Sequence, residues 1–426
     1  MRVVLINQVF YPDMAATAQH ADDLARHLVR HGHEVHVIAS RSIYGQRGAT
    51  LPRRETVAGV EVHRVGLSLF GKGSIPARLL DFGMFYAAAG LKASRVPRPD
   101  VLVCFTTPPF IALVGWFVRL VRGSKYVYWL MDLYPDIAVE CGVMKPGSLT
   151  TRLFDRLNRF CLRKADRVVV LGRCMKEKVE AKGISGEKLL HIGVWSDAAE
   201  VSPVPRSENP YSKRWALGER LTVMYSGNFG LAHDIRTMLD AALRFEHDDG
   251  VRFLFVGGGK RKAEVEAFIA EHGLTNCVVE DYQPRENLHE SLSSGDVHLA
   301  TMINGAEGSI VPCKLFGIMA AGRPTVFIGH PSSELARVLS EHDAGVVVAP
   351  GDVDGLVQAI GELRSDPGRR EQMGANARRA LGEAFSREAA CERWRRMLEE
   401  VVGVEHEHTG DDASDPGLEV ETGFGS

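Results

Sequence analysis

Short runs of consecutive aliphatic residues recur along the chain, and each is followed by a segment of helix length. The first two runs cover residues 3–6 and 34–39. Between them, residues 18–30 carry apolar side chains every three or four positions, as an amphipathic helix does. Further runs lie at residues 101–105, 126–130 and 168–171. Because strands that are apolar on both faces are typical of parallel sheets covered by helices, we predict an α/β protein of the doubly wound type.

The alternation is interrupted over residues 196–220, where Pro203, Pro205 and Pro210 lie among polar residues in a texture that indicates a linker. A second series of apolar runs follows, at residues 222–225, 253–256, 277–279, 297–300, 325–328 and 346–348. A chain of 426 residues also exceeds what one hydrophobic core usually holds. The sequence therefore predicts two doubly wound halves joined by one linker.

We place the first Rossmann-like domain at residues 1–195 and the second at residues 221–385, with helices continuing to about residue 403. Residues 404–426 are acidic and rich in small residues, so we expect them to be disordered. Open parallel sheets bind ligands beyond the carboxyl ends of their strands, which predicts a ligand cleft between the two domains.

Charge and cysteine content exclude several classes of protein. The net charge of −3 gives no global basic bias toward nucleic acid, and the seven cysteines are scattered without a C-x-x-C pair, so they predict neither a disulfide framework nor a metal site. The first apolar run follows Met1 directly, without the pattern of a signal peptide. The longest apolar stretch, residues 110–118, is too short to span a bilayer. We expect a cytoplasmic protein.

The stretch from residue 307 to residue 329 has the pattern of a phosphate site. A loop with Gly308 precedes a short helix that starts at Lys314, Gly322 ends this helix, and a buried strand follows. Such a loop directs free backbone N–H groups and the positive end of the helix dipole at a ligand.

Several polar or glycine-rich segments follow predicted strands. Asp132 comes at the end of a buried strand, where it can orient an acceptor or accept its proton; the alternative is that it caps the next turn. Gly227 and Asn228 follow the first strand of the second half, so their N–H groups can receive a diphosphate. Asp234 is better explained as a helix cap than as a ligand contact.

Two further segments are weaker signals. Gly257 to Lys260 joins glycines to basic residues, as an anionic ligand requires, but it lacks the complete G-x-G-x-x-G pattern. Glu280 and Asp281 lie where a ribose-binding acid would stand in a dinucleotide enzyme, so an NAD-dependent oxidoreductase stays an alternative. Asp352 and Asp354 form a D-x-D pattern, which we interpret as the cap and first turn of a helix and not as a metal site.

Two segments of the first half concern the acceptor and the membrane. Residues 7–17 form a loop of small residues in which Asp13 can meet a hydroxyl group, unless the loop is a plain connection. Residues 72–92 mix lysine and arginine with large apolar residues, as a membrane-surface segment does. The alternative is a helix buried on one face.

Taken together, these residues resemble a known family. The motifs NQVFYPDMAATA with LVRHGHEVHVIASR, MDLYPD, YSGNFGLAHD, DYQPRENLHESLSSGDVHLA and EGSIVPCKLFGIMAAGRP occur in order along about residues 1–400. The chain is similar to retaining glycosyltransferases of family 4 with a GT-B fold, in particular to the bacterial branch that acts in exopolysaccharide, O-antigen and colanic-acid-type assembly.

The resemblance implies transfer of a sugar from a nucleoside diphosphate sugar, which we expect to be UDP-linked, to a glycan or lipid-linked acceptor, with no metal or other cofactor. It further implies an acceptor site in the first half, a donor site in the second, and a last helix, residues 386–403, that crosses back onto the first half. Contact with the inner face of the plasma membrane fits such an acceptor. A nucleotide-sugar epimerase or binding protein is a second alternative.

The candidate site residues follow from these arguments. Fixed N–H groups and a lysine can stabilise the charge of a leaving diphosphate. We predict Asp132, Lys314 and Glu307 as catalytic residues and Asp13 and Thr17 as acceptor contacts. The predicted donor contacts are Gly227, Asn228, His233, Gly257, Lys260, Tyr282, Ser309, Ile310 and Val311. Many members of the family carry an E-x7-E motif, and in this chain Ser309 and Gly317 occupy the positions of its two glutamates. We therefore predict that Glu307 binds the sugar hydroxyls instead.

Overall fold

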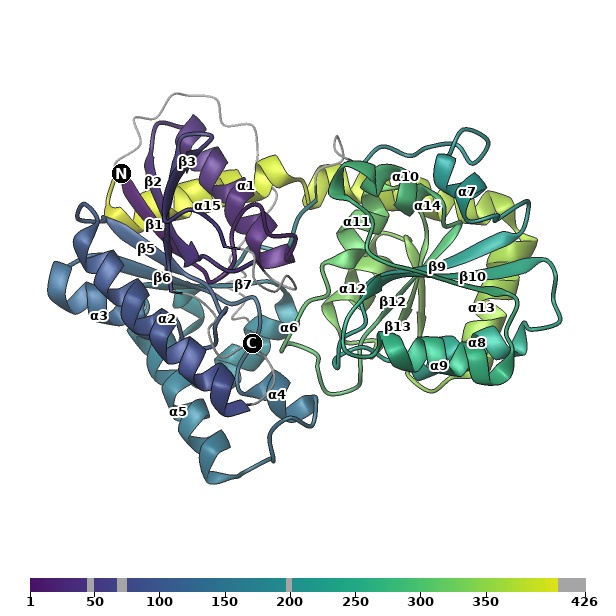
Figure 1. The fold of residues 1–426 in the computed structure, drawn as a ribbon, viewed down its shortest axis with the longest axis horizontal. Helices are drawn as coiled ribbons and strands as arrows, with labels where there is room; N and C mark the ends of the chain where they lie inside the picture. The colour runs from purple at the N-terminus through teal and green to yellow at the C-terminus, as the bar shows by residue number, and fades with distance from the viewer. Residues whose placement is uncertain (44–49, 67–74, 197–200, 405–426) are drawn as a thin grey trace, which may run out of the picture.

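The computed structural model describes residues 1–43, 50–66, 75–196 and 201–404. The chain forms two halves that lie side by side, each a sheet with helices on both faces (Figure 1). This confirms the predicted fold class. The expected tail at residues 404–426 lies, apart from Val404, outside the described residues.

The N-terminal half contains an eight-stranded sheet in the order β3-β4-β2-β1-β5-β6-β7-β8 within the described residues. Its strands are β1 (Arg2–Ile6), β2 (Glu34–Ser40), β3 (Arg54–Val57), β4 (Val60–Val65), β5 (Val101–Cys104), β6 (Lys125–Trp129), β7 (Arg167–Val170) and β8 (Leu189–His191). Its helices are α1 (Ala16–Arg30), α2 (Ile75–Arg95), α3 (Ala112–Arg122), α4 (Asp136–Glu140), α5 (Leu149–Lys164) and α6 (Arg173–Ala181). The neighbours pair in parallel except β3 with β4, so the carboxyl ends of the other strands share one edge.

The hairpin of β3 and β4 has no counterpart among the predicted strands. Ala58 and Gly59 form its two-residue turn, and both have positive φ, 47° and 83°, as a tight hairpin turn requires. β3 is short and half-exposed, so it lacks the apolar run that reveals the buried strands.

The C-terminal half contains a six-stranded parallel sheet in the order β11-β10-β9-β12-β13-β14. Its strands are β9 (Leu221–Asn228), β10 (Val251–Gly258), β11 (Cys277–Glu280), β12 (Val297–Thr301), β13 (Thr325–Ile328) and β14 (Gly345–Val348). Its helices are α8 (Arg236–Arg244), α9 (Lys262–His272), α10 (Leu288–Ser293), α11 (Lys314–Ala320), α12 (Glu334–Glu341), α13 (Val353–Ser365) and α14 (Pro367–Ala384). The predicted linker also holds α7 (Pro210–Arg214), which Asn209 caps by accepting the N–H groups of Tyr211 and Ser212.

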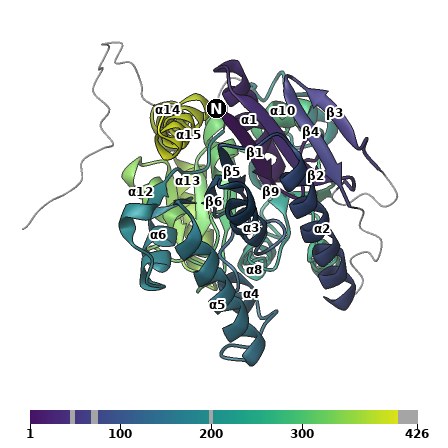
Figure 2. The same cartoon turned by 90° about the vertical axis from the view of Figure 1, so that its left-hand side faces the viewer.

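The last helix, α15 (Arg387–Val402), returns to the N-terminal half. Ser386 caps it by accepting the N–H of Ala389, and α15 then packs along α1 (Figure 2). Trp394 of α15 is fully buried, with its ring centroid 4.3 Å from that of Trp129 in β6. The crossing helix that the resemblance implied is therefore present.

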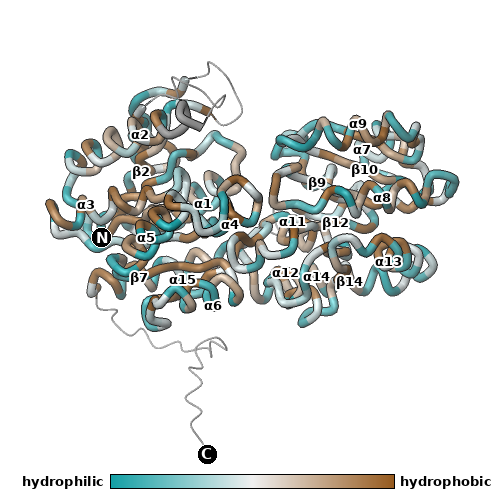
Figure 3. Tube along the Cα trace, turned by 90° about the horizontal axis from the view of Figure 1, so that it is seen from below, coloured by the Kyte–Doolittle hydropathy of each residue, from teal (hydrophilic) through white to brown (hydrophobic). Residues whose placement is uncertain are grey.

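Hydrophobic segments run through both sheets, and hydrophilic ones recur along the covering helices (Figure 3). Within the described ranges, no helix combines the length and the hydropathy that crossing a membrane requires.

Candidate active site

Glycines lie at the carboxyl ends of β9 and β10, which are neighbours in the sheet. Gly227 and Gly257 are direct partners in the parallel ladder and have φ of 141° and 142°, in the region that favours glycine. A Cβ added to Gly257 would lie 1.9 Å from the carbonyl oxygen of Gly227, so no larger residue fits at Gly257 without moving the strands. The two predicted glycine segments therefore end neighbouring strands and pack backbone against backbone.

Lys314 lies beside these strand ends. It is the first residue of α11, and its Nζ donates a 2.5 Å hydrogen bond to the hydroxyl of Tyr225 in β9 and lies 4.0 Å from the centroid of that ring. The Tyr225 hydroxyl donates in turn to the carbonyl oxygen of Asn228, at 2.8 Å. A Cβ built on Gly227 would lie 3.5 Å from Nζ. The structure thus brings Lys314, Gly227 and Asn228 together, although they are far apart in sequence.

Burial lowers the pKa of Lys314 to about 7, because the charged ammonium loses hydration there. Near neutral pH the lysine is therefore close to its titration midpoint. An incoming diphosphate favours the charged form, so binding of such a ligand and protonation of Lys314 support each other.

His233 is buried near Lys314. Its Nδ1–H donates a 2.7 Å hydrogen bond to the carbonyl oxygen of Thr301, and its ring lies edge-on to Tyr225. Burial first, and the charge of Lys314 second, lower the pKa of His233 to about 3. The imidazole is therefore neutral and cannot supply charge to a phosphate. Asp234 accepts the N–H of Thr237 at 3.2 Å, which confirms that it caps the following helix.

Tyr282 and Lys260 lie near the carboxyl end of β10. The Tyr282 ring covers Gly258, since a Cβ there would lie 2.9 Å from it, and yet 56% of the residue is exposed. Lys260 is exposed as well. The neighbouring Lys262 pairs with Asp281, so this acid is engaged by the protein and is not free for a ribose.

Asp132 belongs to the N-terminal half and contacts the C-terminal half. It follows β6 and pairs with Ile310 in an isolated β-bridge, and the N–H of the next residue, Leu133, donates to the carbonyl oxygen of Ser309 at 2.8 Å. The Asp132 N–H is held by Thr106 Oγ1 at 3.1 Å. Burial raises the pKa of Asp132 to about 6. The chain thus places a carboxylate of elevated pKa against the loop that leads to Lys314.

Ser309 does not offer the free N–H group that we predicted. This N–H donates to the carbonyl oxygen of Ala306 at 3.0 Å, and the buried hydroxyl receives Lys178 Nζ at 2.7 Å and donates to Glu140 at 3.0 Å. Ser309 therefore fixes the loop to α4 and α6 of the N-terminal half. Lys178 and Glu140 are positioning residues that the sequence analysis missed, because nothing in their local sequence marks a contact with the opposite half.

One carboxylate oxygen of Glu307 accepts a hydrogen bond, and the other accepts none from the described residues. Its Oε2 accepts the N–H of Gly305 at 2.9 Å, whereas its Oε1 is buried without a hydrogen-bond partner among the described residues. An acceptor atom of this kind suits a sugar hydroxyl. At the second motif position, a Cβ on Gly317 would lie 3.5 Å from Leu292, so that position faces α10. Val311 is buried in the same loop.

Sequence models of two protein domains match the two halves. The model described as "Glycosyl transferase 4-like domain" matches residues 16–195, and that described as "Glycosyl transferases group 1" matches residues 208–380. The chain is a family 4 glycosyltransferase.

Relatives and solved structures agree with this family. The chain is 30% identical to the probable glycosyltransferase WbjE of Pseudomonas aeruginosa, over 63% of this chain and 67% of the relative. It is 25% identical to the putative colanic acid biosynthesis glycosyl transferase WcaI of Escherichia coli K12, over 84% and 91% of the two chains. HepE of Anabaena, solved in complex with UDP-glucose, has the same fold, with a TM-score of 0.71 at 14% identity over 94% of this chain and 100% of HepE. Nothing in these comparisons supports an oxidoreductase or an epimerase.

Of the predicted acceptor residues of this glycosyltransferase, Asp13 lies in the loop before α1 and Thr17 in the first turn of this helix. Asp13 is buried and accepts the N–H of Ala15 at 3.0 Å, and the carbonyl oxygen of Thr17 accepts Asn7 Nδ2 at 3.3 Å. Next to them, the pKa of His20 falls to about 4, through burial and then through the charge of Arg285 from the C-terminal half. His20 in α1 is therefore close enough to the C-terminal half to be affected by the charge of Arg285.

Asp352 and Asp354 of the D-x-D pattern lie at the start of α13. Asp352 accepts the N–H of Gly355 at 2.9 Å as the cap of α13, and Asp354 pairs with Arg244 at 2.7 Å. Among the described residues, His27 and His31 of α1 and Glu392 of α15 lie close enough together to share a metal ion. Asp352 and Asp354 are not part of this group.

Proposed function

We propose that the enzyme transfers a sugar from a UDP-sugar to an acceptor hydroxyl with retention of configuration and without a catalytic metal. The observation that carries this proposal is Lys314 beside the strand ends at Gly227 and Gly257. These groups can supply, without a metal, the charge stabilisation that a leaving diphosphate needs. The complex of HepE with UDP-glucose supports the choice of nucleotide.

In this proposal the bond between the sugar's anomeric carbon and the diphosphate oxygen breaks, and the electron pair leaves with UDP toward Lys314. The acceptor oxygen forms its bond to the same face of the anomeric carbon, and its proton passes to Asp132. The pKa of Asp132, raised by burial to about 6, leaves this carboxylate mostly ionised at neutral pH and still basic enough to accept a proton. Glu307 Oε1 accepts a hydroxyl of the transferred sugar.

A panel of UDP-, GDP- and ADP-sugars tests the proposal. We expect a UDP-sugar to raise the melting temperature, and transfer from it to give a product whose anomeric configuration by NMR equals that of the donor. In excess EDTA the rate should stay within about twofold of the rate without EDTA, because Lys314 and backbone N–H groups stabilise the charge on the diphosphate. A loss of activity in EDTA that magnesium restores, or an inverted product, would contradict the proposal.

We further propose a lipid-linked acceptor presented at the inner face of the plasma membrane. The N-terminal half carries an apolar and basic tip at the start of α5, defined by Leu149, Leu153, Lys145, Arg152 and Arg156. Leu149 is 85% and Leu153 55% exposed. These basic side chains form no ion pair with any residue that the structure describes, and apolar side chains among such cations suit an anionic lipid surface.

This α5 tip is a better candidate than the segment that we predicted. In α2 the side chains of Phe85, Ala89 and Ala93 are buried against the sheet, as the alternative interpretation had it, while Leu80 and Leu91 stay exposed. The beginning of the predicted segment, including Lys72, lies outside the described residues.

Sedimentation with vesicles tests the membrane contact. We expect the enzyme to bind vesicles that contain anionic phosphatidylglycerol. Leu149→Glu together with Leu153→Glu should weaken this binding on the order of tenfold or more, since two apolar side chains that would enter the lipid are replaced by charged ones. Val404→Glu, at another exposed apolar position, is the control. Equal binding by both variants would exclude the tip as the contact.

A further inference from the structure

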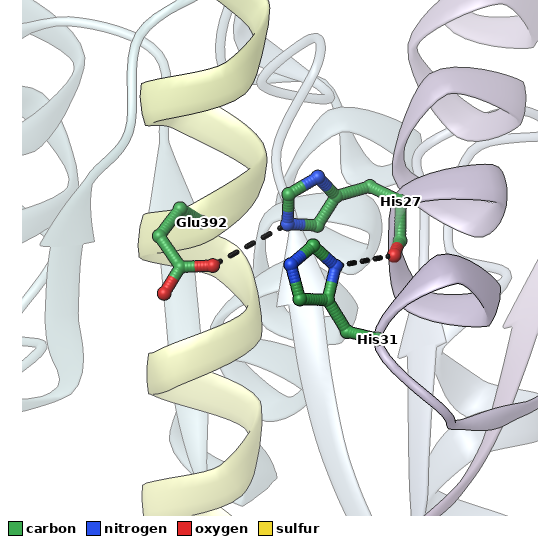
Figure 4. Close-up of side chains that lie close together, drawn as sticks. All are labelled: His27, His31 and Glu392. Atoms are coloured by element: carbon green, nitrogen blue, oxygen red, sulfur yellow. Dashed lines mark hydrogen bonds and ion pairs between the residues drawn. The ribbon is translucent and has the colours of Figure 1, made fainter. Parts of the chain in front are cut away.

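Two histidines and a glutamate converge where the crossing helix meets the N-terminal half. His27 and His31 lie one turn apart on α1, and Glu392 faces them from α15 (Figure 4). One ligand atom from each of the three side chains lies within 4.8 Å of the other two. His27 Nε2 and Glu392 Oε2 are 3.4 Å apart.

The Nε2 atoms of both histidines face the glutamate (Figure 4), and a hydrogen bond at Nδ1 holds the ring of His31 in this position. His31 Nδ1–H donates to the carbonyl oxygen of His27 at 2.8 Å, and His27 Nδ1 lies 3.5 Å from a carboxylate oxygen of Glu388. In metal sites, a ligating imidazole nearly always donates its other N–H to a carbonyl or a carboxylate, which fixes the tautomer. His31 Nε2 is then left to present its lone pair, and at His27 an ion would replace the proton that Nε2 shares with Glu392.

The third side chain is held as an anion. Arg395 donates to both oxygens of Glu392, at 2.8 Å from Nε and 2.6 Å from a terminal nitrogen, and Arg395 is itself balanced by Glu399 at 2.7 Å. Two carboxylates, Glu392 and Glu388, therefore face a pair of imidazoles. His27 is 1% exposed, whereas His31 reaches solvent, which gives an ion a path of entry.

We propose that His27, His31 and Glu392 bind a divalent transition ion of the zinc type. Two imidazole nitrogens and one carboxylate oxygen are a common zinc ligand set, and water would complete the tetrahedron. The ion would join α1 to α15 and so fasten the crossing helix to the N-terminal half. This site is separate from the donor site, and its role is structural and not catalytic.

Metal titration of the full-length enzyme, stripped with EDTA and dialysed, tests the site. We expect one zinc ion to bind per chain and to raise the melting temperature by about 5 °C at saturating concentration, because the ion binds only the folded chain. Cobalt(II) should give the visible absorption of a tetrahedral N/O site. Magnesium should have neither effect, because it prefers six oxygen ligands.

Variants locate the ion. His31→Gln changes an exposed side chain and should lower zinc affinity on the order of 100-fold or more, because one of the three ligands is lost. His247→Gln removes a histidine that is 92% exposed in the other half and should leave zinc affinity unchanged. Zinc affinity that is the same in His31→Gln and His247→Gln would overturn the proposal, as would the absence of stoichiometric binding.

Discussion

Replacing Lys314 by alanine is expected to lower kcat/KM for the sugar donor on the order of 100-fold or more, the usual result of removing one preorganised group that stabilises a developing anion. The lysine is well placed for this role because Tyr225 fixes its ammonium beside the two glycine strand ends. Its ammonium is partly buried, and a charge has a larger effect there than in bulk water. Initial rates over a range of donor concentrations measure the change.

A matched control for Lys314→Ala is Lys262→Ala. Lys262 belongs to the basic segment after β10, but Asp281 and Glu266 already pair with it, so its loss should change kcat/KM by less than about threefold. Lys314→Ala with an unchanged rate at saturating donor would contradict the role assigned to the lysine.

The pH dependence of kcat/KM for the donor gives a second test of the role of Lys314. Its pKa is lowered to about 7, so the protonated fraction falls as the pH rises through 7. We therefore expect kcat/KM for the donor to decline above pH 7 in the wild type. Lys314→Arg should show no such decline up to pH 9, because a guanidinium stays charged there.

Much of this candidate donor site follows from local sequence. A glycine directly after an apolar strand can be recognised without a structure, and so can a lysine at the start of a helix that Gly322 ends. What local sequence lacks is the pairing of Gly257 with Gly227, which depends on β9 and β10 being neighbours in the sheet. The same limit hid the contact of Ser309 with Lys178, since those residues meet only when the halves are side by side.

The cluster of His27, His31 and Glu392 also could not be predicted from local sequence. His27 and His31 have a spacing that puts both on one face of a helix, but their partner Glu392 is 365 residues from His27 in sequence. The resemblance places the last helix on the first half but does not fix which residues of that helix face α1. Trp394, buried against Trp129, sets the rotation of α15 and so points Glu392 at α1.

Replacing Asp132 by asparagine is expected to lower kcat by about 10²–10⁴-fold, the range that a positioned general base contributes. Asparagine has the same size, so the bridge to Ile310, a backbone contact, should persist. In the wild type, kcat/KM should rise with pH through about 6, where Asp132 ionises, and Asp132→Asn should lose this rise. Asp136→Asn, four positions along and turned to Lys182 at 2.9 Å, is the control and should keep most of the activity.

The stability of Asp132→Asn separates a catalytic role from a structural one. A carboxyl whose pKa is raised by folding binds its proton more tightly in the native state, so its contribution to the free energy of unfolding falls as the pH rises from about 4 to about 6. At pH 7 the ionised Asp132 therefore destabilises the fold, and the neutral asparagine should melt at the same or a higher temperature. Lower activity with equal or higher stability would mean that the chain keeps this carboxylate for chemistry. Lower activity with a lower melting temperature would instead assign Asp132 to holding the two halves together.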